Sequence, residues 1–204
     1  MSSDRRTRLT PDQRRAQLVA SGVAFLVEKP LDDLTMEVLS ERVGVSRGLL
    51  FHYFGSRQGL HREVVGTAAA ALLAASVPCE DLAARERLDD TLARIVSFVR
   101  EHRGTFFSLV RGVASGDTEV RHEVDRARDV TAGWVTDGFL ELGAEDSPLL
   151  RVALRSWVNF AEEVLVELAL GTEMPAVDIV SFLSRSAFGV VDSVGADAEQ
   201  APRT

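Results

Sequence analysis

Residues 34–60 read LTMEVLSERVGVSRGLLFHYFGSRQGL, a stretch in which a glycine separates two short helical segments. Thr35 can cap the first segment, because its hydroxyl can accept a hydrogen bond from an unpaired N–H group of the first turn. Gly44 can take the left-handed conformation that ends a helix, and Ser46 can cap the segment that follows. Two short helices joined by so tight a turn are typical of a helix-turn-helix unit.

The sequence outside this stretch predicts an all-α protein of about nine helices. Apolar residues recur at steps of three and four, and the period-two alternation of strands is scarce. Thr10-Pro11 and Ser147-Pro148 are helix-start signals, since a hydroxyl caps the helix and proline suits its first position. The predicted helices cover 10–29, 35–43, 46–53, 56–75, 81–101, 105–114, 116–142, 147–168 and 175–194.

The composition is that of a folded protein from a reducing compartment. Hydrophobic residues make up 46% of the chain and charged residues 26%, and Cys79 is the single cysteine, so no disulfide can form within the chain. The N-terminal arginines are followed by no apolar stretch, and the longest uncharged run, 64–79, is shorter than the roughly 20 residues of a membrane span. We therefore expect a cytoplasmic protein with no membrane segment.

Charge is distributed unevenly along the chain. The net charge is −8, but residues 1–62 hold ten Lys and Arg against seven Asp and Glu, a net of +3, and the remainder carries −11. A basic end on an acidic body can steer that end toward phosphates.

The 34–60 stretch resembles the DNA-binding signature of the TetR family of transcriptional regulators. It departs from the usual pattern at Phe51, where the family often has tyrosine, at Ser40, where alanine is usual, and at Arg57, which replaces a lysine. The positions that match in identity or type are Gly44, Val45, Ser46, Gly48, Leu50, Phe54, Arg57 and Leu60. Chain length and helix count extend the resemblance to the whole protein. It implies a helix-turn-helix DNA-binding domain at 10–55 and a ligand-binding and dimerisation domain at 56–194. The ends of the chain, 1–9 and 195–204, are expected to be flexible tails.

The resemblance and the helix geometry together give candidate DNA contacts. Arg47 follows the cap of the second helix, and its planar guanidinium can bind O6 and N7 of one guanine; the alternative is a solvated surface arginine. Tyr53 can instead pack, Arg57 can be a plain surface charge, and Phe51 and Phe54 are assigned to packing. The full set of candidates is Thr35, Ser46, Arg47, Gly48, Leu49, His52, Tyr53 and Arg57.

The C-terminal part is expected to bind a second copy of the chain and a small, largely apolar effector that releases a repressor from a palindromic operator. Dimer contacts are expected on the last two helices, at Leu154, Val158, Ala161, Leu165, Ile179, Phe182, Leu183 and Phe188. Aromatic residues with polar neighbours suggest an effector pocket formed by Phe98, His102, Phe106, Phe107, Val110, Trp134, Trp157, Asn159 and Phe160. Ordinary monomer core is the alternative for both sets.

Two other classes of protein compete with a regulator. An enzyme is disfavoured because the four histidines are scattered, no zinc-ligand spacing occurs, and Gly112–Gly116 has the wrong order for a nucleophile elbow. We expect no catalytic residues, no metal and no cofactor. A helical interaction module that does not bind DNA is the second alternative.

Overall fold

The computed structural model describes residues 9–112 and 118–200. In these ranges every regular element is helical, which confirms the predicted all-α fold. The elements are α1 (Pro11–Leu26), the 3-10 helix η1 (Leu31–Asp33), α2 (Met36–Val43), α3 (Arg47–Phe54), α4 (Arg57–Ser76), α5 (Ala84–Glu101), α6 (Arg103–Gly112), α7 (Thr118–Glu141), α8 (Pro148–Val164), the π-helix η3 (Leu165–Leu170) and α9 (Ala176–Gln200).

Hydroxyl caps begin the helices where the sequence predicts. The Thr10 hydroxyl accepts a hydrogen bond from the N–H of Gln13 at 3.2 Å, and the Gln13 side chain accepts one from the N–H of Thr10 at 3.0 Å. The Ser147 hydroxyl accepts from the N–H of Leu150 at 3.1 Å, with Pro148 in the first turn. Such caps satisfy N–H groups that have no partner inside the helix, so each start is encoded locally.

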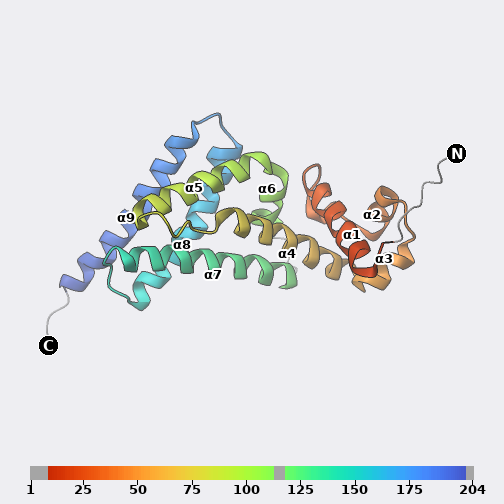
Figure 1. Ribbon diagram of the computed structural model, residues 1–204, viewed down its shortest axis with the longest axis horizontal. Coiled ribbons are helices and arrows are strands. Elements are labelled where there is room, and N and C mark those ends of the chain that lie inside the picture. Colours follow the sequence, from red (N-terminus) through yellow and green to blue (C-terminus); the bar gives the residue numbers. More distant parts are fainter. Residues whose placement is uncertain (1–8, 113–117, 201–204) are drawn as a thin grey trace.

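The molecule is elongated, with a small head at one end and a larger body at the other (Figure 1). Helices α1–α3 form the head, α5–α9 form the body, and α4 runs from the head into the body, where it packs along α7. Each part has its own apolar core. The head core includes Leu18, Phe25, Leu39, Leu50, Phe54 and Leu60, and the body core includes Val96, Val99, Leu154, Trp157, Ile179 and Leu183.

Glycines allow α1 to lie close to its two neighbours. A Cβ atom at Gly22 of α1 would fall 2.5 Å from Cγ2 of Val64 in α4. At Gly104, in the first turn of α6, a Cβ would meet the carbonyl oxygen of Leu26 and would lie 2.6 Å from that of Val27. The head therefore packs closely against α4 and α6 at positions where a larger residue would clash.

The structure differs from the expected elements at three places. The turn η1 was not predicted, and the helix expected at 147–168 changes to a π-helix at Leu165. The tail expected from 195 is helical to Gln200, in line with the helix propensity of Ala, Glu and Gln in that segment. The expected helix start at 116–117, the N-terminal arginines and the last four residues lie outside the described residues.

No helix in the two described ranges combines the length and the apolar character needed to cross a membrane.

Candidate functional site

The α2–α3 segment forms a helix-turn-helix with both of its predicted caps in place. The hydroxyl of Thr35 accepts a hydrogen bond from the N–H of Val38 at 3.1 Å, and that of Ser46 accepts one from the N–H of Leu49 at 3.3 Å. Gly44 joins the helices at φ 66° and ψ 39°, a left-handed conformation that costs other residues steric strain.

Helix α3 buries one face in the head and turns the other to solvent. Leu50 and Phe54 are buried in the head core. Of the predicted DNA contacts on this helix and its cap, Ser46, Arg47, Gly48 and His52 are exposed, and Leu49 and Tyr53 are half-buried. The structure thus places Ser46, Arg47, Gly48 and His52 on an outward-facing surface, while Tyr53 packs against the head core and Thr35 lies half-buried at the start of α2.

Phe51 corrects the sequence interpretation, which assigned it to packing. Its exposed fraction is 51%, because it follows Arg47 and Gly48 by about one helical turn and so shares their outward face. The head core is filled from the opposite face of α3. The outward surface therefore carries an aromatic ring beside Arg47 and His52.

Arg47 already has a partner in the DNA-free protein. Its Nη1 donates to Oε1 of Glu37 on α2 at 2.6 Å, although 62% of the Arg47 side chain and 56% of the Glu37 side chain are exposed. The hydrogen bond from Arg47 is the main reason why the pKa of Glu37 is lowered. A DNA contact by Arg47 has to replace this pair.

Two side chains of α4 fix the head to that helix. Arg57 donates a hydrogen bond from Nη2 to the carbonyl oxygen of Asp32, so the predicted phosphate contact also ties α4 to η1. Buried His61 lies with its Nε2 2.7 Å from the carbonyl oxygen of Leu34, just before α2. The sequence analysis did not single out His61, and nothing in its local pattern pointed to a partner 27 residues away.

The body contains a cavity of about 80 Å³ with largely apolar walls, between α4, α5, α7 and α8. Of the predicted pocket residues, Phe106, Trp134 and Trp157 line it, and Val110 lines an adjoining pocket. The other five lie elsewhere: Phe107, Phe160, His102 and Asn159 are exposed, and Phe98 packs against the His102 ring at a centroid distance of 4.5 Å. Leu72 and Ser76 of α4 also line the cavity.

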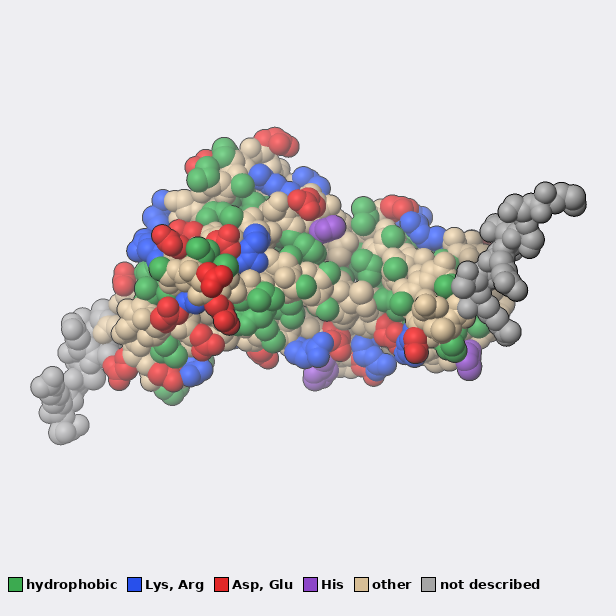
Figure 2. Space-filling view, viewed as in Figure 1, with side chains coloured by type: hydrophobic (Ala, Val, Ile, Leu, Met, Phe, Trp, Pro, Cys, Tyr) green, Lys and Arg blue, Asp and Glu red, His purple; other side chains and the backbone are tan. Residues whose placement is uncertain are grey.

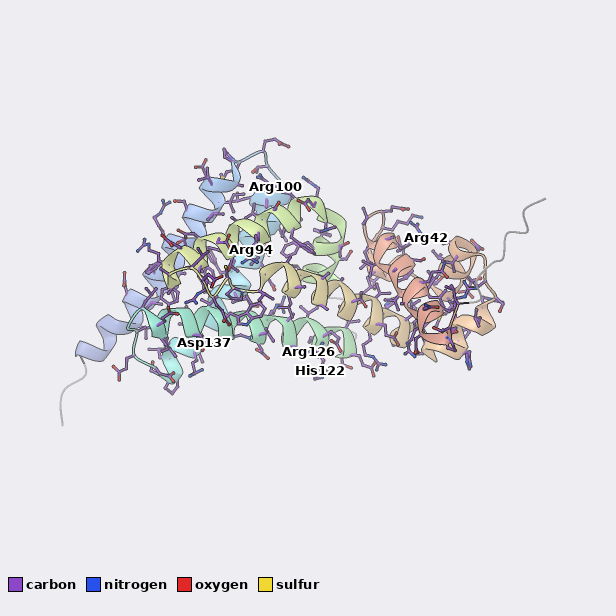
Figure 3. All side chains as sticks on the ribbon, viewed as in Figure 1. Arg42, Arg94, Arg100, His122, Arg126 and Asp137 are labelled. Carbon is purple, nitrogen blue, oxygen red and sulfur yellow. The ribbon has the colours of Figure 1, made fainter. Side chains whose placement is uncertain are left out.

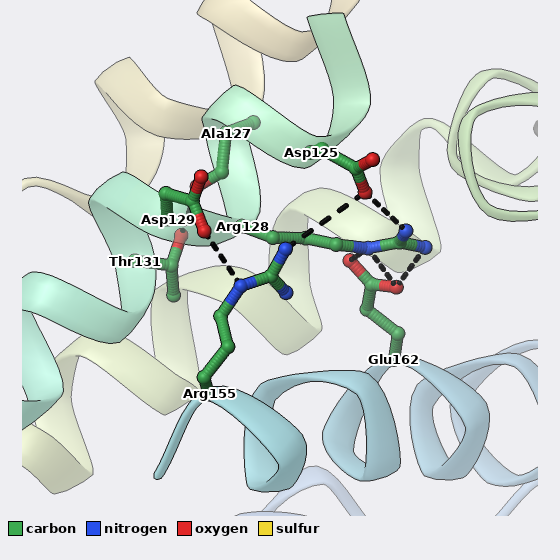
Figure 4. Close-up of polar contacts among 7 residues, drawn as sticks. All are labelled: Asp125, Ala127, Arg128, Asp129, Thr131, Arg155 and Glu162. Atoms are coloured by element: carbon green, nitrogen blue, oxygen red, sulfur yellow. Dashed lines mark hydrogen bonds and ion pairs between the residues drawn. The ribbon is translucent and has the colours of Figure 1, made fainter. Parts of the chain in front are cut away.

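Glu162 in the cavity wall forms an ion pair with Arg128, and Figure 4 shows its contacts. Glu162 of α8 lines both the cavity and the adjoining pocket, and its carboxylate accepts hydrogen bonds of 2.7–3.0 Å from Nε and Nη2 of Arg128 on α7. The two side chains are only 14% (Arg128) and 18% (Glu162) exposed. Burial acts to lower the pKa of Arg128, but Glu162 and Asp125 outweigh that effect and raise it. The sequence analysis missed this pair, since 34 residues separate its members.

Most of the predicted dimer contacts are enclosed within their own chain. Helix α8 is apolar on two faces, and one of these faces packs into the body core. The buried residues are Leu154, Val158, Ala161, Leu165, Ile179 and Leu183, and Phe188 is half-buried against Phe139. In this conformation the buried six are not available to a second copy of the chain.

The other face of α8 and part of α9 expose apolar side chains. Phe182 is 39% exposed and Phe160 is 42% exposed, with their ring centroids 6.0 Å apart, and Val152 on α8 is also exposed. These three residues are called the α8–α9 strip below. Sequence analysis placed Phe182 at a dimer surface and Phe160 in the effector pocket, and Val152 was in neither set.

Two family models match most of the chain. Residues 18–64 match the family described as bacterial regulatory proteins, tetR family, and residues 84–190 match the tetracyclin repressor-like C-terminal domain. The chain belongs to the TetR family. It is therefore a TetR-family transcriptional regulator with an N-terminal DNA-binding domain, as the resemblance of the 34–60 stretch predicted.

Solved structures share this TetR fold at low sequence identity. A tetR-family transcriptional regulator from Streptomyces coelicolor has a TM-score of 0.74 at 23% identity, covering 93% of this chain and 91% of that one. A TetR-like regulator from Rhodococcus sp. RHA1 has a TM-score of 0.63 at 22% identity, with 89% and 97% covered. A TetR regulator from Legionella pneumophila has a TM-score of 0.64 at 14% identity, with 88% and 98% covered. No curated protein sequence matches the chain.

Proposed function

We propose that this TetR-family regulator is a repressor that binds a palindromic operator as a homodimer and leaves it when a small, largely apolar molecule enters the body cavity. The proposal rests on one observation, the exposed outward face of α3. Arg47, Gly48, Phe51 and His52 form a continuous exposed surface directly behind a capped helix N-terminus.

The outward face of α3 has the chemistry needed to read a major groove. Arg47 binds two acceptors of a guanine, and the small Gly48 next to it lets the backbone come close to the bases. The ring of Phe51 contacts a thymine methyl or a deoxyribose, and His52 reaches the next base edge. Thr35 and Ser46 add phosphate contacts through their hydroxyls and the N–H groups that follow them.

A single head of this size makes too few contacts for tight operator binding. Helix-turn-helix proteins solve this by pairing two heads on half-sites about one helical turn, or a multiple of it, apart. The α8–α9 strip is the surface for that pairing in our proposal, because exposed aromatic rings in contact with one another are well suited to bury against their symmetry mates.

Helix α4 couples the cavity to the head. Its first turns hold the head through Arg57 and His61, and its last turns supply Leu72 and Ser76 to the cavity wall. An effector that binds more tightly to one position of α4 shifts the distance between the two heads of a dimer. A molecule that binds equally well to both positions of α4 leaves the distance between the heads unchanged and does not release the DNA.

The test is binding to DNA from the promoter region of the protein's own gene. Substitution Arg47→Ala is expected to weaken that binding by about 5- to 150-fold, because a bidentate contact to guanine contributes about 1–3 kcal/mol. Fluorescence anisotropy with labelled duplexes measures the affinity, and size-exclusion chromatography checks that the oligomeric state is unchanged.

Arg151→Ala is the matched control. Arg151 lies on α8, outside the head. Like Arg47 it has an exposed side chain (56%) and forms an ion pair, with Asp146 at 2.7 Å. We expect the control to bind like the wild type. Equal affinity for promoter and unrelated DNA would contradict the proposal and favour a helical interaction module.

A further inference from the structure

We propose that the effector is an apolar molecule bearing one protonated amine, and that Glu162 recognises that amine. The inference rests on the proposed function, since it takes the body cavity to be the effector site. It goes further by naming the chemistry that the cavity selects, which follows from the charges of the cavity wall and of a neighbouring pocket.

The ion-pair network beside the cavity carries an excess of negative charge. Arg128 pairs with Asp125 and Glu162, and Arg155 pairs with Asp129 at 2.6 Å and lies 3.8 Å from Asp125 (Figure 4). Two arginines therefore face three carboxylates, a formal charge of −1. Asp125 and Asp129 lie outside the cavity lining, with side chains 44% and 67% exposed, so Glu162 is the carboxylate that acts inside the cavity. In these largely apolar surroundings its charge attracts a cation more strongly than it would in water, and it opposes an anion.

Glu162 retains a free acceptor position for such a cation. Its Oε2 accepts hydrogen bonds from Nε and Nη2 of Arg128, at 2.9 and 2.7 Å, whereas Oε1 accepts one bond from the part of the chain that the structure describes, from Nε at 3.0 Å. A carboxylate oxygen can accept two hydrogen bonds, so an ammonium N–H can bind Oε1 while Arg128 stays in place. A hydroxyl group can make the same bond but gains no charge attraction.

A pocket that shares Trp134 with the cavity has the same charge preference. Trp134 lines both the cavity and an outer pocket, and that pocket is bordered by Glu80, Asp137 and Glu141 with a single cation, Arg87, so its formal charge is −2. Asp137 lies on the half of α7 away from the head (Figure 3), and acidic side chains gather over this end of the body (Figure 2). A cation is therefore favoured on approach as well as in the cavity.

The two tryptophans favour the same ligand. Trp134 and Trp157 both line the cavity, and indole faces attract cations beyond what their apolar area contributes. The remaining wall is largely apolar, which favours a hydrocarbon body over a large polar molecule.

Tryptophan fluorescence gives a direct test, because both tryptophans of the chain line the cavity. The probes are n-octylammonium, 1-octanol and octanoate, which share a hydrocarbon chain and differ in charge. Titrated into the wild-type protein at pH 7, octylammonium is expected to bind at least about tenfold more tightly than octanoate, and more tightly than octanol. This comparison requires no variant.

Substitution Glu162→Gln is expected to abolish the preference for the ammonium probe, with circular dichroism confirming the fold. Glu163→Gln is the matched control, since Glu163 is the next residue of α8, is exposed and lies outside the cavity lining. The control is expected to keep the wild-type preference. A preference that survives Glu162→Gln would overturn the role of Glu162.

The remaining outcomes separate this inference from the proposed function. Octanol or octanoate binding as tightly as octylammonium would overturn the ligand class and leave the cavity as an effector site. No response to any of the three probes would overturn the cavity as an effector site and this inference with it, while the DNA-binding part of the proposed function would stand.

Discussion

Arg47 and Glu37 form an exposed ion pair on the surface that we propose faces DNA, and this has a consequence for affinity. When Arg47 moves to a guanine, Glu37 loses its partner and remains near the phosphates. Substitution Glu37→Gln removes that competition, so we expect operator affinity to rise by about two- to fivefold, the range for an exposed ion pair. Because Arg47 lowers the pKa of Glu37, the pair is lost only at a pH below the ordinary carboxyl value of 4.5.

The control for this substitution is Glu41→Gln. Glu41 is also exposed on α2, so its removal subtracts the same charge from the same helix without touching the Arg47 pair. Anisotropy titrations of both variants at one salt concentration separate the two effects. An equal gain in both variants would mean that general charge, rather than release of Arg47, sets the affinity.

Residues whose role depends on nearby sequence were predictable, and those whose role depends on distant contacts were not. The caps at Thr35 and Ser46 follow from residue types a few positions apart. Phe51 was assigned to packing because the pattern of α3 alone does not say which aromatic faces the core. The Arg128–Glu162 pair joins two helices, and no local pattern predicts which helices meet.

At the scale of elements, the contact between α1 and α6 leaves no room for an added methyl group. Substitution Gly104→Ala places a Cβ 2.6 Å from the carbonyl oxygen of Val27, so α6 has to move away from α1. We expect a loss of about 1–3 kcal/mol in the free energy of unfolding, the usual cost of overpacking, measured by urea denaturation.

The control is Gly133→Ala on α7, where no described atom outside the neighbouring residues and the backbone of α7 itself lies within 4 Å of the new Cβ. Alanine is favoured over glycine inside a helix, so this variant is expected to be unchanged or more stable by about 0.5–1 kcal/mol. Similar losses in both variants would argue against a tight α1–α6 contact.

Helix starts at a hydroxyl cap or a proline were predicted to within one residue, as were several C-terminal ends, whereas α5 begins at Ala84 instead of 81. Hydroxyl caps and prolines announce a helix start in the sequence, as at Thr10 and Ser147. The π-helix Leu165–Leu170 and the turn η1 have no comparable signal, because they depend on how neighbouring helices pack. The faces of α8 were likewise ambiguous, since an apolar helix surface can meet its own core or a second chain.

At the scale of the whole molecule, we expect the α8–α9 strip to hold two chains together. Substitution Phe182→Asp would place a charge in the dimer interface, and we expect the dimer dissociation constant to rise by about 30-fold or more, with a parallel loss of operator binding. Sedimentation equilibrium measures the first effect. Leu142→Asp, at an exposed apolar residue outside the strip, is the control. A dimer that survives Phe182→Asp would place the interface elsewhere.

Hydroxyl-radical footprinting of the promoter DNA tests the central claim most directly, because it reports where α3 lies and how many copies of it are bound. We predict two protected segments related by a twofold axis, on one face of the duplex, about one helical turn or a multiple of it apart, with both lost in Arg47→Ala. A single protected segment, two segments on opposite faces, or a footprint that Arg47→Ala leaves unchanged would contradict the account.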